Sequence, residues 1–277
     1  MNDALTFPLS YSARNPAYWL ILPTSIAFMG AVAGAGSIPL VFIAALLTLT
    51  YPAAFITCAP NALYDQETDT YNDREYLRGK QLSDDDAPAV WGWTAVFAAV
   101  CLTPALIAWN LEALLIGAAM ILAALAYSVP PLRLKAHPEL SLILMSVGAW
   151  LLYAYGYAYT DTITTIPTRS FYYAFLAHTA VSLGALPDIE ADKEAGDTTF
   201  PVKYGETPTL LLGIAAALTT LLSGTVTGVV AAFIAALAAA MTSMIFVKHY
   251  VAHFKAIAAV GLTTIIILVT RGVTAAL

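Results

Sequence analysis

Residues 40–70 read LVFIAALLTLTYPAAFITCAPNALYDQETDT, an apolar run that passes directly into a polar and acidic one. A helix needs about 20 mainly apolar residues to cross the hydrocarbon core of a bilayer. The run over 38–62 meets that requirement and predicts a membrane-spanning helix. Asp65 and Asp69 then follow at the point where this helix is expected to leave the membrane.

The composition of the whole chain agrees with this local pattern. Its 277 residues are 60% hydrophobic and only 11% charged, and the mean hydropathy is +0.75. Soluble domains are roughly 45–50% apolar and about 25% charged, so a soluble globule of this composition could not cover its surface with polar groups. The composition therefore excludes a cytosolic enzyme and a disordered chain, and it predicts a polytopic membrane protein. The net charge of -6 leaves no basic patch that would bind nucleic acid.

Apolar runs of similar length recur along the chain. They predict an all-α integral membrane fold with nine transmembrane helices, in a single membrane domain over residues 1–277. The spans are expected at 17–36, 38–62, 88–109, 111–128, 138–159, 168–187, 207–224, 226–247 and 253–275. Very short polar breaks between neighbouring spans, such as Asn110 with Glu112, indicate tight antiparallel helix hairpins.

The basic residues are distributed unevenly over the predicted connections. Positive residues stay preferentially on the cytoplasmic side of a membrane. If the N-terminus is inside, the outer connections hold only Arg169 and Arg271. The cytoplasmic connections then hold the other basic residues, which are Arg14, Arg74, Arg78, Lys80, Arg133, Lys135, Lys193, Lys203, Lys248 and Lys255. This asymmetry predicts a multi-pass protein of the cell membrane with a cytoplasmic N-terminus and a C-terminus outside.

Four tyrosines close the fifth predicted span on its outer side. They are Tyr153, Tyr155, Tyr157 and Tyr159. A spacing of two residues spreads side chains around a helix instead of along one face. We therefore expect an aromatic belt at the membrane interface, not a ligand pocket.

Most of the 18 acidic residues lie in two of the cytoplasmic connections, 61–87 and 188–206. A run of charges is in most cases a solvated loop. From the number of charges alone, two solvated loops are the favoured interpretation.

The internal spacing of these acids favours a binding site instead. Asn61, Asp65 and Asp69 recur every four residues and continue the second span without a break, so they are expected along one helical face. Asp188 and Asp192 have the same spacing at the end of the sixth span. Stacked like charges destabilise a helix and are costly beside a membrane, so two such rows facing one cavity would need cations. Oxygen ligands suit Mg²⁺, which commonly binds together with substrate phosphates, and the spacing therefore predicts a metal–diphosphate site between two helix ends.

Three motifs that follow one another in the chain carry a resemblance to a known family. They are Asn61-x3-Asp65-x3-Asp69 with Asn72 and Arg74 after it, Tyr127-Ser-Val-Pro-Pro-Leu-Arg133-Leu-Lys135, and Asp188-x3-Asp192 followed by Gly196-x-x-Thr199. In order, in spacing and in the number of spans, the chain resembles the UbiA superfamily of intramembrane prenyltransferases. The resemblance implies nine helices around a central cavity that opens sideways to lipid. It also implies two pseudo-halves, at about 1–137 and 138–277, that each contribute one acidic motif.

The resemblance further implies the chemistry of the site. Mg²⁺ would make diphosphate a good leaving group of an allylic prenyl diphosphate, and a hydrophobic, lipid-soluble acceptor would attack the resulting cation. The implied metal ligands are Asp65, Asp69, Asp188 and Asp192, with Asn61 as a ligand of metal or phosphate. The candidates for binding the diphosphate are Arg133 and Lys135, followed by Arg74 and Lys193. A bias of positive residues toward the inside would by itself also explain basic residues in these loops.

Three stretches are similar to one branch of that superfamily, the carotenoid-modifying lycopene elongases. They are Asn15-Pro16-Ala17-Tyr18-Trp19, Asn72 after the first motif, and Ala177-His178 ahead of Leu186-Pro187-Asp188-Ile189-Glu190-Ala191-Asp192. This similarity implies transfer of a five-carbon dimethylallyl unit onto lycopene, with the cation quenched by proton loss or water. The alternative acceptor is an aromatic quinone precursor or another lipid.

Two other classes of protein are compatible with a polytopic chain that carries acids. One is a cation-coupled transporter, although transporters tend to place ionisable residues near the midplane of the membrane, and the acids here lie at helix ends. The other is a scaffold without activity, against which the complete acidic motifs argue. His178, inside the sixth span, is either a functional ionisable group or a neutral residue bonded to a neighbouring helix.

Overall fold

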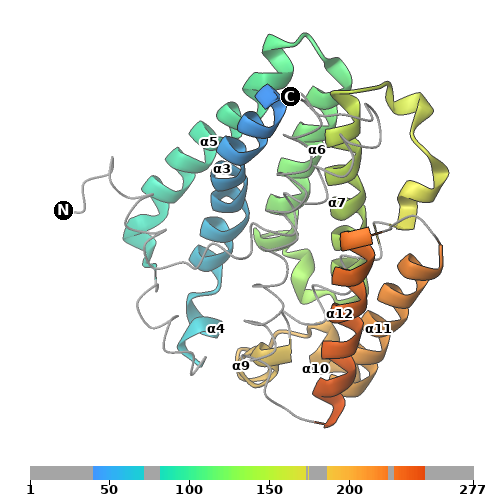
Figure 1. Cartoon of the computed structure of the whole chain (residues 1–277). Coiled ribbons are helices and arrows are strands. Elements are labelled where there is room, and N and C mark those ends of the chain that lie inside the picture. The colour runs from blue at the N-terminus through green and yellow to red at the C-terminus, as the bar shows by residue number, and fades with distance from the viewer. Residues whose placement is uncertain (1–39, 72–81, 173, 175–185, 224–227, 247–277) are drawn as a thin grey trace.

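The computed structural model describes residues 40–71, 82–172, 174, 186–223 and 228–246. All regular structure in these residues is helical (Figure 1). The helices are α3 (Leu40–Tyr64), α4 (Gln66–Thr70), α5 (Ala87–Ile107), α6 (Leu111–Ser128), α7 (Pro138–Ala158), α9 (Ile189–Glu194), α10 (Phe200–Tyr204), α11 (Glu206–Leu222) and α12 (Gly228–Phe246). Short 3₁₀ turns lie between them: η2 (Asp84–Asp86), η3 (Leu134–Ala136), η4 (Ile163–Thr165), η5 (Thr168–Phe171) and η6 (Leu186–Asp188).

The long helices agree closely with the predicted spans. Helices are present for the spans predicted at 38–62, 88–109, 111–128, 138–159, 207–224 and 226–247. Within the described residues, three helices are long and apolar enough to cross a membrane, namely Asp84–Ile107, Leu111–Ser128 and Pro138–Ala158. The spans predicted at 17–36 and 253–275, and most of the one at 168–187, lie outside the described residues. The number of nine spans therefore stays a prediction, as do the single domain and its pseudo-halves.

Helices α3, α5, α6 and α7 pack side by side (Figure 1). Gly117 lets α6 approach its neighbours closely, because a Cβ atom there would lie 3.1 Å from Leu102 and 3.3 Å from Tyr155. Asn110 begins α6 as its N-cap, accepting a hydrogen bond from the backbone N–H of Ala113 at 2.9 Å. Its amide also donates to the carbonyl of Ala158 at 2.6 Å, which ties the α5–α6 hairpin to the end of α7.

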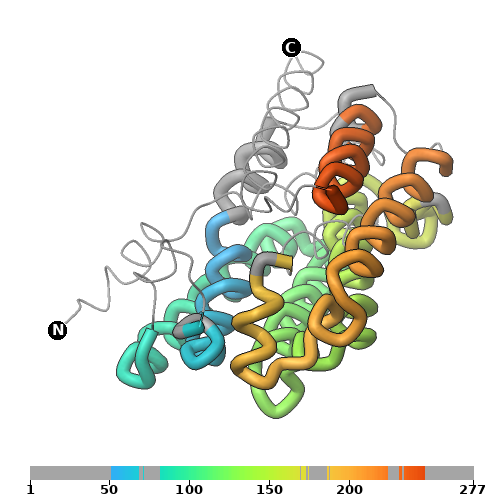
Figure 2. The backbone as a smooth tube through the Cα atoms, turned by 90° about the horizontal axis from the view of Figure 1, so that it is seen from below, coloured from blue at the N-terminus to red at the C-terminus, as the bar shows by residue number. Residues whose placement is uncertain are grey.

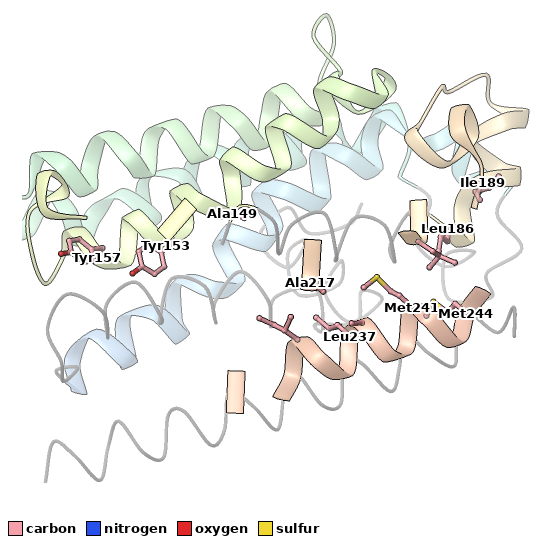
Figure 3. Close-up of a cluster of buried hydrophobic side chains, with 12 residues drawn as sticks. Ala149, Tyr153, Tyr157, Leu186, Ile189, Ala217, Leu237, Met241 and Met244 are labelled. Carbon is pink, nitrogen blue, oxygen red and sulfur yellow. The ribbon is translucent and has the colours of Figure 1, made fainter. Parts of the chain in front are cut away.

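The second half of the fold is built on α11 and α12, which pack against each other. Figure 3 shows the buried cluster that joins them to α7 and α9. Met241 and Met244 of α12 lie in this cluster together with Leu186 and Ile189, which flank Asp188 in the chain. Burial of these apolar side chains anchors the second acidic motif to the helical bundle.

The predicted aromatic belt is wrong for three of its four tyrosines. Tyr153, Tyr155 and Tyr157 are only 3%, 9% and 4% exposed, so their rings pack inside the protein and do not face lipid. Tyr157 finds polar partners in the segment after α7, where its hydroxyl donates to Asp161 at 3.1 Å. The helical periodicity of the sequence did not predict the burial of these tyrosines, because other helices pack against more than one face of α7.

The polar connections between the long helices lie at one end of the bundle. Helices α4, α9 and α10 lie together at this end, and Figure 2 views the molecule from that side. Helix α10 is fastened to the start of α7, because Lys203 and Tyr204 both donate hydrogen bonds to the carboxylate of Glu139. The two predicted acidic connections therefore meet at one end, as far as their residues are described.

Candidate active site

Asp65 lies in a short break between two helices. Helix α3 ends at Tyr64 and α4 begins at Gln66, although the backbone N–H of Asp65 still donates to the carbonyl of Asn61 at 2.9 Å. The expectation that the acidic motif continues the second span without a break is therefore wrong at this residue.

The carboxylate of Asp65 is buried, 6% exposed, and has three donors around it. Asn61 donates from Nδ2 to Oδ2 at 2.6 Å, and Arg133 donates from Nη2 to Oδ1 at 3.2 Å. Lys135 also forms an ion pair with Oδ1. Ser128 orients the amide of Asn61 by donating to its Oδ1 at 2.8 Å. The first motif and the basic loop after α6 thus form one connected polar cluster.

The loop that supplies the two cations has an unusual backbone. Arg133 has a φ of 32°, in the left-handed region that non-glycine residues rarely adopt. This conformation precedes η3, in which Lys135 lies. Strained backbone of this kind persists where surrounding contacts stabilise it, and the shared partner Asp65 provides such contacts here.

The second motif is centred on Asp192. Asp188 is the N-cap residue of α9, and Asp192 follows inside that helix with 8% of its surface exposed. Thr199 donates from its hydroxyl to Oδ2 of Asp192 at 2.9 Å. Burial, together with the nearby charges of Asp188 and Asp197, raises the pKa of Asp192 to about 6, against the opposing effects of Thr199 and Lys135. A carboxylate with a raised pKa among other acids is a position where a cation would relieve repulsion.

The end of α9 determines the position of a further acid, Asp197. Gly196 adopts a φ of +78°, its N–H donates to the carbonyl of Lys193 at 3.1 Å, and the N–H of Asp197 donates to the carbonyl of Asp192 at 2.8 Å. This is a Schellman C-cap, which requires a left-handed residue and favours glycine. Asp197 is buried, and its carboxylate accepts a hydrogen bond from Nη2 of Arg133 at 3.0 Å.

Two further observations bring the two motifs to the same place. Helix α4 packs against α9. The guanidinium of Arg133 forms ion pairs both with Asp65 of the first motif and with Asp197, which follows the second motif. The predicted proximity of the two acidic rows is therefore present in the described residues.

Other predicted site residues are not part of this cluster or fall outside the described residues. Lys193 is exposed on α9 and lies 3.8 Å from the carboxylate of Glu190. Asp69 belongs to α4, but the structure does not describe its side chain. Arg74 and His178 lie outside the described residues. In the described part of the chain, no three His, Cys, Asp or Glu side chains gather closely enough to hold a metal ion.

Prediction from the sequence missed two residues of the cluster, Ser128 and Asp197, as well as the role of Thr199. The signal for Asp197 was present, because a glycine after a short polar helix predicts a C-cap that turns the next residue back toward the helix. Ser128 offered no comparable signal, since a lone serine at a helix end is common.

A helical membrane bundle with two acidic motifs and a basic loop at one end defines an intramembrane prenyltransferase. The chain belongs to the UbiA prenyltransferase family, whose family model matches residues 20–265. This membership decides between the classes of protein that the sequence left open, in favour of an enzyme over a transporter.

Individual relatives agree with this membership. The chain is 32% identical over 211 residues to a lycopene elongase/hydratase of Haloarcula japonica, an alignment that covers 73% of this chain and 69% of the relative. Its fold is similar to that of a UbiA homolog from Archaeoglobus fulgidus bound to GPP and Mg²⁺, with a TM-score of 0.65 and 20% identity over 92% of this chain and 99% of that one. The same homolog bound to DMAPP and Mg²⁺ matches with a TM-score of 0.57 and 20% identity, covering 91% and 97% of the two chains.

Proposed function

We propose that the protein transfers a prenyl group from an allylic diphosphate to a hydrophobic acceptor, in a reaction that depends on Mg²⁺. The observation that carries the proposal is the guanidinium of Arg133, which lies 3.2 Å from Asp65 of the first motif and 3.0 Å from Asp197, the acid that follows the second motif, with Lys135 also paired to Asp65. Carboxylates that bind a divalent metal and cations that bind phosphate oxygens are the two components that a metal–diphosphate site needs.

The described residues fit a magnesium ion chemically. Their donors are oxygen atoms, and the raised pKa of Asp192 reflects burial among acids that a divalent cation would stabilise. Asp65, Asp188 and Asp192, with Asp69 on α4, would hold the metal. Bound there, Mg²⁺ supplies Lewis acidity that stabilises the departing diphosphate.

The basic loop residues would bind the substrate itself. Arg133 and Lys135 are the proposed partners of the diphosphate oxygens, because a guanidinium matches phosphate geometry and an ammonium supplies a compact charge. Asn61, held between Ser128 and Asp65, would offer its amide to metal or phosphate. Arg74 and Lys193 are proposed as secondary diphosphate partners. In the reaction, the allylic C–O bond breaks, the acceptor double bond forms the new C–C bond, and the resulting cation loses a proton or adds water.

We propose lycopene as the acceptor and dimethylallyl diphosphate as the donor. Support comes from the 32% identity to a lycopene elongase/hydratase. Purified protein with Mg²⁺, dimethylallyl diphosphate and lycopene should form a carotenoid that is longer by five carbons, detected by chromatography and mass spectrometry. The control replaces lycopene by an aromatic quinone precursor with a longer prenyl diphosphate. Product in the control alone would overturn the carotenoid acceptor and favour the quinone-type reaction.

We further propose nine transmembrane helices with the active site at the cytoplasmic face. Support comes from the basic residues, of which only Arg169 and Arg271 fall on the predicted outer side. Ser83 lies in the first acidic connection, and Thr162 follows the C-terminal end of α7, a helix about 31 Å long at 1.5 Å per residue.

The orientation is testable by cysteine labelling. After replacement of Cys58 and Cys101 by alanine, Ser83→Cys should react with an impermeant thiol reagent only from the cytoplasm and Thr162→Cys only from outside. Both positions are exposed, so reactivity reports sidedness and not burial. Labelling of both cysteines from one side would contradict the proposed topology, and the cysteine-free protein shows the background.

A further inference from the structure

The guanidinium of Arg133 is shared between two carboxylates from different loops. Its Nη2 lies 3.2 Å from Oδ1 of Asp65 and 3.0 Å from Oδ2 of Asp197. Both acid side chains are 9% exposed, and that of Arg133 is 30% exposed. One nitrogen of Arg133 thus forms ion pairs with an acid of the first motif and with the acid that follows the second motif.

This sharing leaves hydrogen-bonding capacity of Arg133 unused. Its Nε is buried and has no hydrogen-bond partner among the residues that the structure describes. A buried donor without a partner costs free energy, so such an atom in a substrate site indicates a place for an acceptor. Because Nη2 is already shared by the two carboxylates, Nε is a donor that remains for a phosphate oxygen.

Asp197 is held rigidly enough to position a partner. The C-cap at Gly196 and the hydrogen bond to the carbonyl of Asp192 determine its backbone, and its side chain is buried. Without Asp197, Arg133 would be free to pair through two nitrogens with Asp65, because bidentate pairing is the stronger geometry for arginine and carboxylate. That pairing would occupy both the phosphate-binding fork and a proposed metal ligand.

We propose that Asp197 is a positioning residue for the donor substrate: it draws the guanidinium of Arg133 away from bidentate pairing with Asp65 and keeps its Nε available to an oxygen of the diphosphate. The inference rests on the proposed function, since it assumes that Arg133 binds an allylic diphosphate. It adds a residue to the site that acts through Arg133 and does not itself touch the substrate.

The test is a double-mutant cycle measured by binding, not by turnover. The probe is radiolabelled dimethylallyl diphosphate, titrated with Mg²⁺ present against the full-length protein in detergent. Asp197→Asn should weaken binding about tenfold, because a mispositioned guanidinium forfeits a charge-assisted hydrogen bond to the diphosphate. In the Arg133→Ala background, the same change should alter binding less than twofold, since its effect passes through Arg133.

Two matched variants distinguish a positioning role of Asp197 from a general effect of the negative charge in this loop. A measurement of thermal unfolding distinguishes it from an effect on folding. Glu194→Gln removes one negative charge from the exposed surface of α9 and should leave binding unchanged. Asp197→Glu keeps the carboxylate and should restore most of the affinity. Thermal unfolding in detergent, followed for every variant, shows whether a loss of binding accompanies a loss of fold.

The outcomes are distinct. If Asp197→Asn weakens binding equally with and without Arg133, or if it leaves binding unchanged in the presence of Arg133, the positioning role is overturned and the proposed function stands. If the unmodified protein binds no allylic diphosphate in the presence of Mg²⁺, the proposed function falls and the role of Asp197 falls with it.

Discussion

Replacing Asp65 or Asp192 by asparagine should lower the rate of prenyl transfer by on the order of a thousandfold, since several kcal/mol of charge stabilisation at the metal would be lost. Asparagine preserves the size of the side chain and removes its charge. At Asp65 the change also leaves Lys135 without its carboxylate partner and Arg133 paired with Asp197 alone, so this variant should lose stability as well. Asp192 has no recorded ion pair among the described residues, and its substitution should affect activity more selectively.

The measurement is release of diphosphate and formation of prenylated product by purified variants that are folded like the unmodified protein. Asp85→Asn is the matched control, because Asp85 is an exposed acid in the same acidic connection as Asp65. It should retain full activity. Full activity in both Asp65→Asn and Asp192→Asn, with Mg²⁺ present, would remove the basis for a metal site. Substitution of Asp69 or Asp188 by asparagine is expected to have the same effect.

Removing divalent metal should have an effect of similar size. Chelation with EDTA should bring prenyl transfer below detection, and added Mg²⁺ should restore it. Ca²⁺ should restore much less, because it prefers more ligands and longer metal–oxygen distances than Mg²⁺. Binding of dimethylallyl diphosphate should also weaken in EDTA, since the carboxylates around the diphosphate would then be uncompensated.

The readouts for metal removal are equilibrium binding and product formation in the same preparation. Thermal unfolding of the chelated protein is the control for loss of fold. Undiminished binding and turnover in EDTA would contradict a metal-dependent mechanism and would leave basic residues such as Arg133 and Lys135 to balance the charge of the diphosphate.

Local sequence patterns determined the helices and the residue types of the site. The apolar run before Asn61 predicted α3, and the polar break at Asn110 placed the start of α6 at the correct residue. These features depend on hydrophobic length and capping, which neighbouring residues control. The spacing of Asp188 and Asp192 predicted a helical arrangement of the second motif at the end of the sixth span, and in the structure Asp188 caps α9 while Asp192 lies inside it.

Contacts between segments that are distant in the sequence decided the partners of the site residues and the burial of α7. Asp65 lies in a break where a helix was predicted, and its partners Arg133 and Lys135 are 68 and 70 residues away. Tyr153 and its neighbours are buried because other helices pack on more than one side of α7, which the period of a single helix cannot express.

The sequence by itself therefore determined that the protein is a helical membrane protein with two acidic motifs, because length, hydropathy and spacing are local properties. Only the tertiary structure decided that Arg133 is shared between Asp65 and Asp197. These ion pairs form because folding brings segments that are distant in the sequence together in the protein interior. Their geometry depends on the helices that hold those segments in place.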